Sequence, residues 1–443
     1  MRVLPLLFAV LVAAPMPSAH AQVATSAQVS PPAAPEASPE LKARLAALPD
    51  ILNGRGDYDS YFAANFRAAV PKDKFAQMIQ QLMGSVGPFV AIERVTIVSP
   101  WEATLDVGFR DAVGSGKIIV DKAEPHQVTG FGLSSLVARA ASVDEVVKQI
   151  AALPGLTGFA FATLGDGAPR IDAARNADTP LAIGSAFKLT ILAELVREVN
   201  AGERHWDDKE TLDGTQLPGG AYVFYPKGAE VTIRELAGKM ISISDNSATD
   251  ILLRTLGREK VEAMMPVVGV ADPARNRPFL STLEMFKLKG IAGLDARWLA
   301  TDEAGRRAML AEVDAAPVTS IRTDLFRDGK PIHVDTIEWY YSPADLVRVM
   351  DWLRRNTASG PGAEARAILG KNPGIGPASA GRWQYVGYKG GSEPGVLNLT
   401  LLLQGKDGSW HVLTASWNDT TKDVELNRLL SLISRAADLS APK

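Results

Sequence analysis

The chain has 443 residues, enough for two or three domains, and its 47 basic and 50 acidic residues give a net charge of −3. This balance argues against nucleic acid or an anionic membrane as a partner. The absence of cysteine excludes disulfides, thiol catalysis and thiolate metal sites. The histidines beyond His20 are widely separated and show no metal-ligand spacing, so no metal and no cofactor is expected.

Residues 1–21 have the pattern of a secretory signal peptide. Arg2 is followed by an apolar stretch, and Ala19-His20-Ala21 forms a small-x-small cleavage site before Gln22. The apolar stretch is too short to span a bilayer. Residues 22–40 are rich in Pro, Ala and Ser and predict a disordered linker. We therefore expect a periplasmic or secreted protein without a membrane span, mature from Gln22.

Residues 41–140 predict a small α+β domain. Helical periodicity appears at 41–52 and 74–83, and strand-like segments follow at 89–98, 102–109 and 117–122. Turn signals divide these strands at Ser99-Pro100 and Gly114-Ser115-Gly116. Helices followed by hairpin-linked strands are typical of helices packed on one face of an antiparallel sheet.

Residues 150–440 predict a second, larger domain of the α/β (α+β) class. Two strand segments (157–164 and 169–176) precede a long helical region, and three strand segments (383–390, 396–404 and 410–417) precede a final helix at 424–437. This order predicts a mixed, mostly antiparallel five-stranded sheet flanked by helices.

The first candidate catalytic feature is Ser185, three residues before Lys188 in "GSAFKLTILAELVREV". Residues three apart share a helix face, so the lysine amine can lie beside the serine hydroxyl. A serine hydroxyl needs an adjacent base to become a nucleophile, and a lysine shifted toward its neutral form can serve. The alternative is an ordinary N-cap serine with a surface lysine.

Two later segments favour the catalytic interpretation. Ser244-Asp245-Asn246 lies in the apolar stretch "ISISDNSATD", where polar groups are costly to bury without partners. Lys389-Gly390-Gly391 follows a strand in "VGYKGGSEPG", where glycines permit close backbone approach. Taken singly, the first is a common turn or cap triplet and the second a common hairpin sequence.

Together, the three segments resemble the S-x-x-K, S-D-N and K-[ST]-G set of class A β-lactamases and penicillin-binding proteins. The resemblance covers roughly residues 150–440. It implies that Ser185 is the acylated nucleophile, that Lys188 is its base or part of a relay, and that Ser244 passes a proton to the leaving group. It further implies that Asn246 and Lys389 bind substrate, beside Gly391 and the backbone N–H groups of Ser185 and Ser392, which form an oxyanion hole.

Two features depart from this family. Gly390 stands where the family has Thr or Ser, so a hydroxyl that contacts the substrate carboxylate is missing. The spacing from Ser244 to Lys389 is also longer, with extra residues near 272–330 that we expect to form helices over the active site. The family's deacylating glutamate has no clear counterpart in the loop before 342–355. Asp324 is a candidate substitute and Glu338 a weaker one, and either can equally be a surface charge.

The N-terminal domain resembles the steroid-isomerase-like or cystatin-like domain that precedes β-lactamase-like domains related to a clavulanic-acid-cluster protein. We find no acid–base constellation there, so a packing or partner-binding role is expected. The leading hypothesis is a monomeric exported serine hydrolase that acts on β-lactams or related amides and esters. A D-alanyl-D-alanine peptidase or esterase, and a non-catalytic β-lactam- or peptidoglycan-binding protein, remain open alternatives.

Overall fold

The computed structural model describes residues 35–442, which fold into two compact units, one ending at Arg139 and the other beginning at Ala140. The expected signal peptide and most of the expected linker lie outside the described residues. The first helix begins at Pro39, just inside the linker predicted for 22–40. None of the described helices combines the length and the apolar character needed to cross a bilayer.

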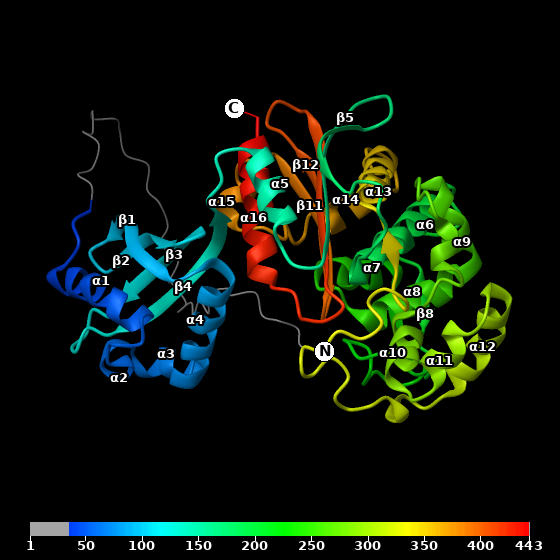
Figure 1. The fold of residues 1–443 in the computed structure, drawn as a ribbon, viewed down its shortest axis with the longest axis horizontal. Helices are drawn as coiled ribbons and strands as arrows, with labels where there is room; N and C mark the ends of the chain where they lie inside the picture. Colours follow the sequence, from blue (N-terminus) through cyan, green and yellow to red (C-terminus); the bar gives the residue numbers. More distant parts are fainter. Residues whose placement is uncertain (1–34, 443) are drawn as a thin grey trace, which may run out of the picture. The chain divides into compact units, whose positions relative to one another are not determined.

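The first unit consists of helices followed by a four-stranded sheet, the α+β order that the sequence predicts (Figure 1). Its strands pair antiparallel in the order β1-β2-β3-β4. The elements are α1 (Pro39–Leu52), α2 (Tyr58–Tyr61), α3 (Ala64–Ala69), α4 (Lys72–Val86), β1 (Phe89–Ser99), β2 (Glu102–Phe109), β3 (Ala112–Val120) and β4 (Val128–Ala138). Between helices and sheet, the buried Phe62 ring stacks on Phe66 with centroids 4.2 Å apart, which anchors the core of this unit.

The predicted turn at Gly114-Ser115-Gly116 is wrong, because these residues lie inside β3. The glycines are needed where the neighbouring strand comes close: a Cβ on Gly116 would lie 2.0 Å from the Gly132 carbonyl oxygen. The register also shifts between Ser115 and Gly116, so the pair of strands has an irregularity there. Strand β4 was not predicted, since its glycines and serines dilute the apolar alternation.

The second unit is built on the five-stranded sheet that the sequence predicts, and every neighbouring pair in it is antiparallel. The strands are β5 (Leu156–Leu164), β6 (Arg170–Arg175), β11 (Tyr385–Glu393), β12 (Val396–Gln404) and β13 (Trp410–Asn418). Their order is β11-β12-β13-β5-β6, which leaves β11 as an edge strand. Strand β12 is buried along almost its whole length, as an apolar run between two helical layers should be.

Helices cover both faces of this sheet (Figure 1). One face packs against α5 and α16, and the other packs against α13, which in turn contacts α6. The helices are α5 (Val143–Ala151), α6 (Lys188–Asn200), α7 (Ile233–Ser242), α8 (Asn246–Leu256), α9 (Arg258–Val267), α10 (Thr282–Gly290), α11 (Leu294–Leu299), α12 (Glu303–Ala315), α13 (Pro343–Asn356), α14 (Ala363–Leu369), α15 (Pro377–Ala380) and α16 (Leu426–Ser440). Short strand pairs join β7 (Leu181–Ala182) to β10 (Tyr340–Tyr341) and β8 (Lys209–Thr211) to β9 (Glu230–Thr232).

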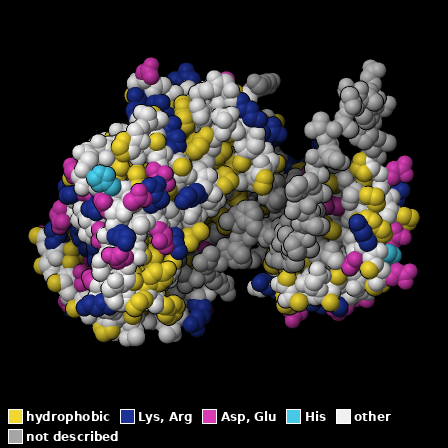
Figure 2. All heavy atoms as spheres, turned by 180° about the vertical axis from the view of Figure 1, so that it is seen from behind, with side chains coloured by type: hydrophobic (Ala, Val, Ile, Leu, Met, Phe, Trp, Pro, Cys, Tyr) yellow, Lys and Arg dark blue, Asp and Glu magenta, His cyan; other side chains and the backbone are white. Residues whose placement is uncertain are grey.

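Helices α10, α11 and α12 lie within the extra segment at 272–330, which is helical as expected. Figure 2 shows basic and acidic side chains interspersed over one face of the second unit. This mixture agrees with the near-neutral net charge and with the absence of a basic balance in the sequence.

Candidate active site

Ser185 lies in a short 3₁₀ turn, η1 (Gly184–Phe187), that leads directly into α6. Lys188 is the first residue of α6, and its backbone N–H donates to the carbonyl oxygens of Ser185 and Ala186. In a 3₁₀ turn the residues at i and i+3 lie on the same side. The structure therefore places Ser185, which is partly exposed, on the same side of the turn as the fully buried Lys188.

The Lys188 ammonium group is held by the S-D-N segment. Its Nζ donates to the Ser244 carbonyl oxygen at 2.8 Å, the Ser244 Oγ at 3.2 Å and the Asn246 Oδ1 at 2.7 Å. Burial lowers the pKa of Lys188 to about 7, although the nearby charges of Asp250 and Asp245 act in the opposite direction. Near neutral pH this lysine is therefore divided between amine and ammonium, the balance that a general base needs.

Ser244 occupies a tight connection between α7 and α8 in a left-handed backbone conformation, with φ of 58°. A residue other than glycine adopts this conformation only where its surroundings enforce it. Here Asp245 caps α8 through the Ala248 N–H at 2.8 Å and also accepts from the Ala221 N–H at 2.7 Å. These bonds fix the turn and hold the Ser244 hydroxyl at the site.

Lys389, on the edge strand β11, reaches the same hydroxyl. Its Nζ donates to the Ser244 Oγ at 3.0 Å and to the Gly390 carbonyl oxygen. Burial, and secondarily the charge of Lys188, lower the pKa of Lys389 well below its usual value. The Ser244 hydroxyl thus lies between two buried lysines, an arrangement suited to passing a proton between groups.

The backbone of β11 packs directly against the backbone of η1. A Cβ on Gly391 would lie 2.0 Å from the Ile183 carbonyl oxygen and 2.4 Å from the Ser185 nitrogen. Gly184, with φ of 49°, lies so close to β11 that its Cβ would be 2.9 Å from the Ser392 nitrogen. Only glycine fits either position. The backbone amides of Ser185 and Ser392 are thereby brought to one place, as an oxyanion hole requires.

Asp324, the predicted deacylating base, is an exposed surface residue. Its carboxylate pairs with the Arg322 Nε at 2.8 Å, and both side chains are about half exposed. The guanidinium of Arg322 lowers the pKa of Asp324. Within residues 35–442, no hydrogen bond or ion pair connects Asp324 with Lys188, Ser244 or Lys389, so its catalytic role stays a prediction.

Glu338, the weaker candidate, belongs to a buried cluster that sequence reasoning missed. Lys289 on α10 pairs with Glu338 at 3.2 Å and with Glu393 on β11, and the Lys289 and Glu338 side chains are fully buried. Burial and the neighbouring Glu338 charge raise the pKa of Glu393, while the two carboxylates keep the pKa of Lys289 raised. One feature of the sequence could have indicated part of this cluster: Glu393 lies two residues beyond Gly391, so both residues lie on the same face of β11.

The segment after Glu338 also contacts the η1 turn that carries Ser185. The Trp339 ring stacks on Phe187 with centroids 3.7 Å apart, and the Ile183 N–H donates to the Trp339 carbonyl oxygen at 3.0 Å. The Trp339 ring and the Trp339 carbonyl group thus hold the turn that carries Ser185. No spacing in the sequence predicts this contact.

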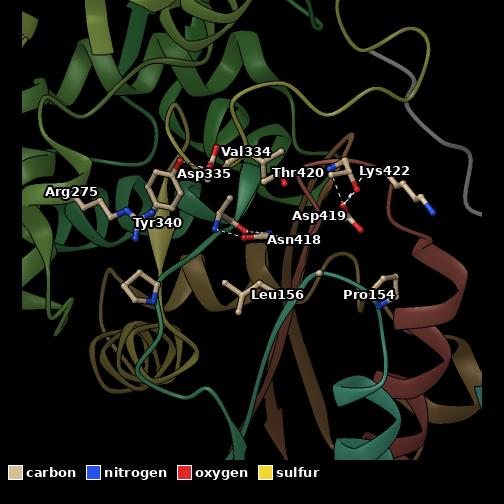
Figure 3. Close-up of a pocket in the computed structure, with 14 residues that line it drawn as sticks. Pro154, Leu156, Arg275, Val334, Asp335, Tyr340, Asn418, Asp419, Thr420 and Lys422 are labelled. Carbon is tan, nitrogen blue, oxygen red and sulfur yellow. Dashed lines mark hydrogen bonds between the residues drawn. The ribbon is translucent and has the colours of Figure 1, made fainter. Parts of the chain in front are cut away.

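A separate cavity of about 480 Å³ lies in the second unit, and Figure 3 shows the residues that line it. One wall is formed by the Arg275 guanidinium, 3.9 Å from the centre of the Tyr340 ring, and another by Asn418, whose side chain bonds the backbone of Ala182. None of the predicted site residues lines it. Among the described residues, no group of three or more histidine, aspartate or glutamate side chains is placed to hold a metal ion.

The sheet, its two helical layers and this meeting of η1, the α7–α8 turn and β11 define a β-lactamase-like fold. The sequence model of the beta-lactamase enzyme family matches residues 139–372, more than half of the chain. The protein therefore belongs to the beta-lactamase enzyme family. No curated protein matches the sequence.

Several solved structures are similar over 67% of this chain. The β-lactamase of Sphaerobacter thermophilus DSM 20745 is 22% identical, with 95% of its own chain covered and a TM-score of 0.46. The β-lactamase of Chitinophaga pinensis DSM 2588 is 18% identical, with 96% covered and a TM-score of 0.46. PBP-A is 16% identical, with 94% covered and a TM-score of 0.45.

Proposed function

We propose that this protein is an exported serine hydrolase that forms an acyl-enzyme at Ser185 and acts on β-lactams or related amides and esters. The observation that carries the proposal is the hydrogen-bonded pair of buried lysines. Lys188 lies one 3₁₀ turn from Ser185, and both Lys188 and Lys389 bond the Ser244 hydroxyl. A merely structural serine cap would not need two buried amines beside it, since burying a cation is costly.

Acylation begins when the neutral Lys188 amine takes the Ser185 hydroxyl proton as the Ser185 Oγ bonds to the substrate carbonyl carbon. The carbonyl electron pair moves to its oxygen, which accepts hydrogen bonds from the Ser185 and Ser392 backbone N–H groups. Collapse breaks the bond to the leaving nitrogen or oxygen. That atom takes a proton relayed from Lys188 through the Ser244 hydroxyl, and the acyl group stays on Ser185.

Deacylation requires a water molecule and a base, and here the proposal favours slow turnover. Asp324 is exposed and paired with Arg322, and Glu338 is buried in an ion pair. Neither carboxylate has the free, partly solvated setting of an efficient general base. This supports a second candidate, a penicillin-binding peptidase or esterase with the same nucleophile and a long-lived acyl-enzyme.

The test is to incubate the protein with a fluorescent penicillin and with a chromogenic ester, and to measure intact mass and the labelled peptide. We expect one adduct on Ser185 and no adduct in Ser185→Ala. Ser431→Ala is a matched control, because Ser431 is a buried hydroxyl on α16 that donates to the Arg428 carbonyl oxygen at 2.8 Å. Undiminished labelling of Ser185→Ala would remove the assignment.

A further inference from the structure

Two fully buried lysines near β11 differ in one respect that bears on the substrate. Lys289 has two carboxylate partners, Glu338 and Glu393, and its pKa is raised. Lys389 forms no ion pair with any residue in 35–442, and its pKa is lowered. A buried ammonium without a counter-ion is unfavourable. Lys389 is therefore suited to meet an anion that the folded chain does not itself supply.

A second hydrogen-bonding group stands beside Lys389, on the other face of the same strand. A Cβ on Gly390 would lie 2.1 Å from the Tyr388 Oη, so the Tyr388 hydroxyl occupies the space where a side chain at 390 would begin. The Tyr388 ring is held there by Gly374, whose Cβ would come within 2.3 Å of the ring. The absence of side chains at Gly374 and Gly390 thus leaves space for the Tyr388 side chain.

The Tyr388 hydroxyl has an unused hydrogen-bonding capacity. Among the described residues it makes no hydrogen bond, and Tyr388 is only partly buried. Burial raises the pKa of Tyr388, so the phenol remains a protonated donor at neutral pH. By contrast, Tyr385 on the same strand already donates to the Arg366 carbonyl oxygen at 2.7 Å.

We propose that the Tyr388 hydroxyl, together with the Lys389 ammonium, binds the carboxylate of an anionic substrate, so that Tyr388 determines specificity for substrates carrying a free carboxylate. This inference rests on the proposed function and assigns a substrate-binding group to it. The position lies on the edge strand β11, next to Gly391, which abuts the Ser185 nitrogen. A carboxylate there receives one charged and one neutral donor, while the substrate carbonyl faces Ser185.

The geometry also makes residues 388 and 390 mutually exclusive as sources of a hydroxyl. Threonine at 390 would place its Cβ against the Tyr388 hydroxyl, so both cannot be present with the Tyr388 ring in its position. The hydroxyl that is missing at Gly390 is, on this inference, supplied by Tyr388, two residues earlier along the strand.

The experiment compares the acylation rate constants of the full chain with a chromogenic cephalosporin and with the methyl ester of the same compound. We expect Tyr388→Phe to lower the preference for the free acid by about tenfold or more, the value of a hydrogen bond to a charged group, with little change for the ester. Tyr385→Phe is the control, because it removes the same atom from the same strand. The double variant Tyr388→Val with Gly390→Thr should recover the preference that Tyr388→Val loses.

An acid-to-ester preference that is the same in Tyr388→Phe and the wild type, or that falls equally in Tyr385→Phe, overturns this inference. Acylation of Ser185 with an unchanged preference overturns it alone and leaves the proposed function standing. Absence of any acylation of the wild type overturns the proposed function and this inference with it.

Discussion

The pH dependence of acylation provides a direct test of Lys188 as the base. The drop in its pKa from 10.5 to about 7 corresponds to about 5 kcal/mol against the ammonium form. With this pKa, about a tenth of the molecules carry the neutral amine at pH 6 and about nine-tenths at pH 8. The acylation rate constant should therefore rise about tenfold between pH 6 and pH 8, with a midpoint near pH 7.

Asp250→Asn perturbs this midpoint without touching Ser185 or Lys188. Asp250 is buried on α8, and its charge is the largest influence that raises the Lys188 pKa. Removing that charge should move the midpoint to lower pH. Because burial raises the pKa of Asp250 itself to about 6, the carboxylate is already largely protonated in acid, so the two profiles should differ most above pH 6.

The assay is stopped-flow acylation by a chromogenic cephalosporin from pH 5 to pH 9 at constant ionic strength. Asp345→Asn is the control, since Asp345 is likewise buried and caps α13 through the Ser342 N–H at 2.9 Å, but does not act on Lys188. Circular dichroism at each pH checks that the variants stay folded. A rate constant that is flat across this range, or a midpoint that Asp250→Asn leaves in place, would refute the assignment of Lys188 as the base.

Three further predictions concern stability, backbone packing and turnover. Lys188→Met should abolish acylation yet raise the free energy of unfolding by up to about 5 kcal/mol, because the Lys188 pKa is about 7 in the folded state and 10.5 in the unfolded state. Thermal melts should show the whole increase in stability below pH 7 and its loss as the pH approaches 10.5. Gly391→Ala should destabilise the fold by about 1–3 kcal/mol and slow acylation strongly, because the added Cβ would clash with the Ile183 and Ser185 backbone. Gly165→Ala is the control: Gly165 has open space around it, so this variant should change neither denaturant unfolding nor labelling of Ser185. Steady-state cephalosporin hydrolysis should follow a burst and stay slow, and Asp324→Asn should reduce it further; fast turnover that the variant retains would place the deacylating base elsewhere.

The parts of the site that could be predicted are those encoded by short-range spacing. Ser185 and Lys188 are three residues apart, so one turn of helix decides their relation whatever the rest of the chain does. The polar run at Ser244 and the glycines after Lys389 were visible as exceptions within apolar segments. The sheet was predictable for a similar reason, because its strands are long apolar runs between clear turns.

The parts that could not be predicted depend on residues brought together from distant segments. The cluster of Lys289, Glu338 and Glu393 joins a helix, a loop and a strand, and no spacing links them. Tyr388 was visible as an aromatic beside a lysine, but only the packing against Gly374 places its hydroxyl at Gly390. The turn predicted at Gly114-Ser115-Gly116 was wrong for the same reason, because these glycines lie where a neighbouring strand comes close, not in a turn.

Several features that are unfavourable for folding meet around the Ser244 hydroxyl group. Ser244 is held at positive φ, Lys188 and Lys389 are buried beside it with no ion pair to any described residue, and Gly391 packs strand backbone against η1. Lys289, by contrast, has carboxylate partners, and α13 begins with a capping box. Unfavourable features that meet in one place mark it as a candidate site, since strain and unpaired burial persist only where the surrounding structure enforces them. The same reasoning separates the Ser185 region from the 480 Å³ cavity of Figure 3, whose wall residues Asn418 and Arg275 are paired within the fold.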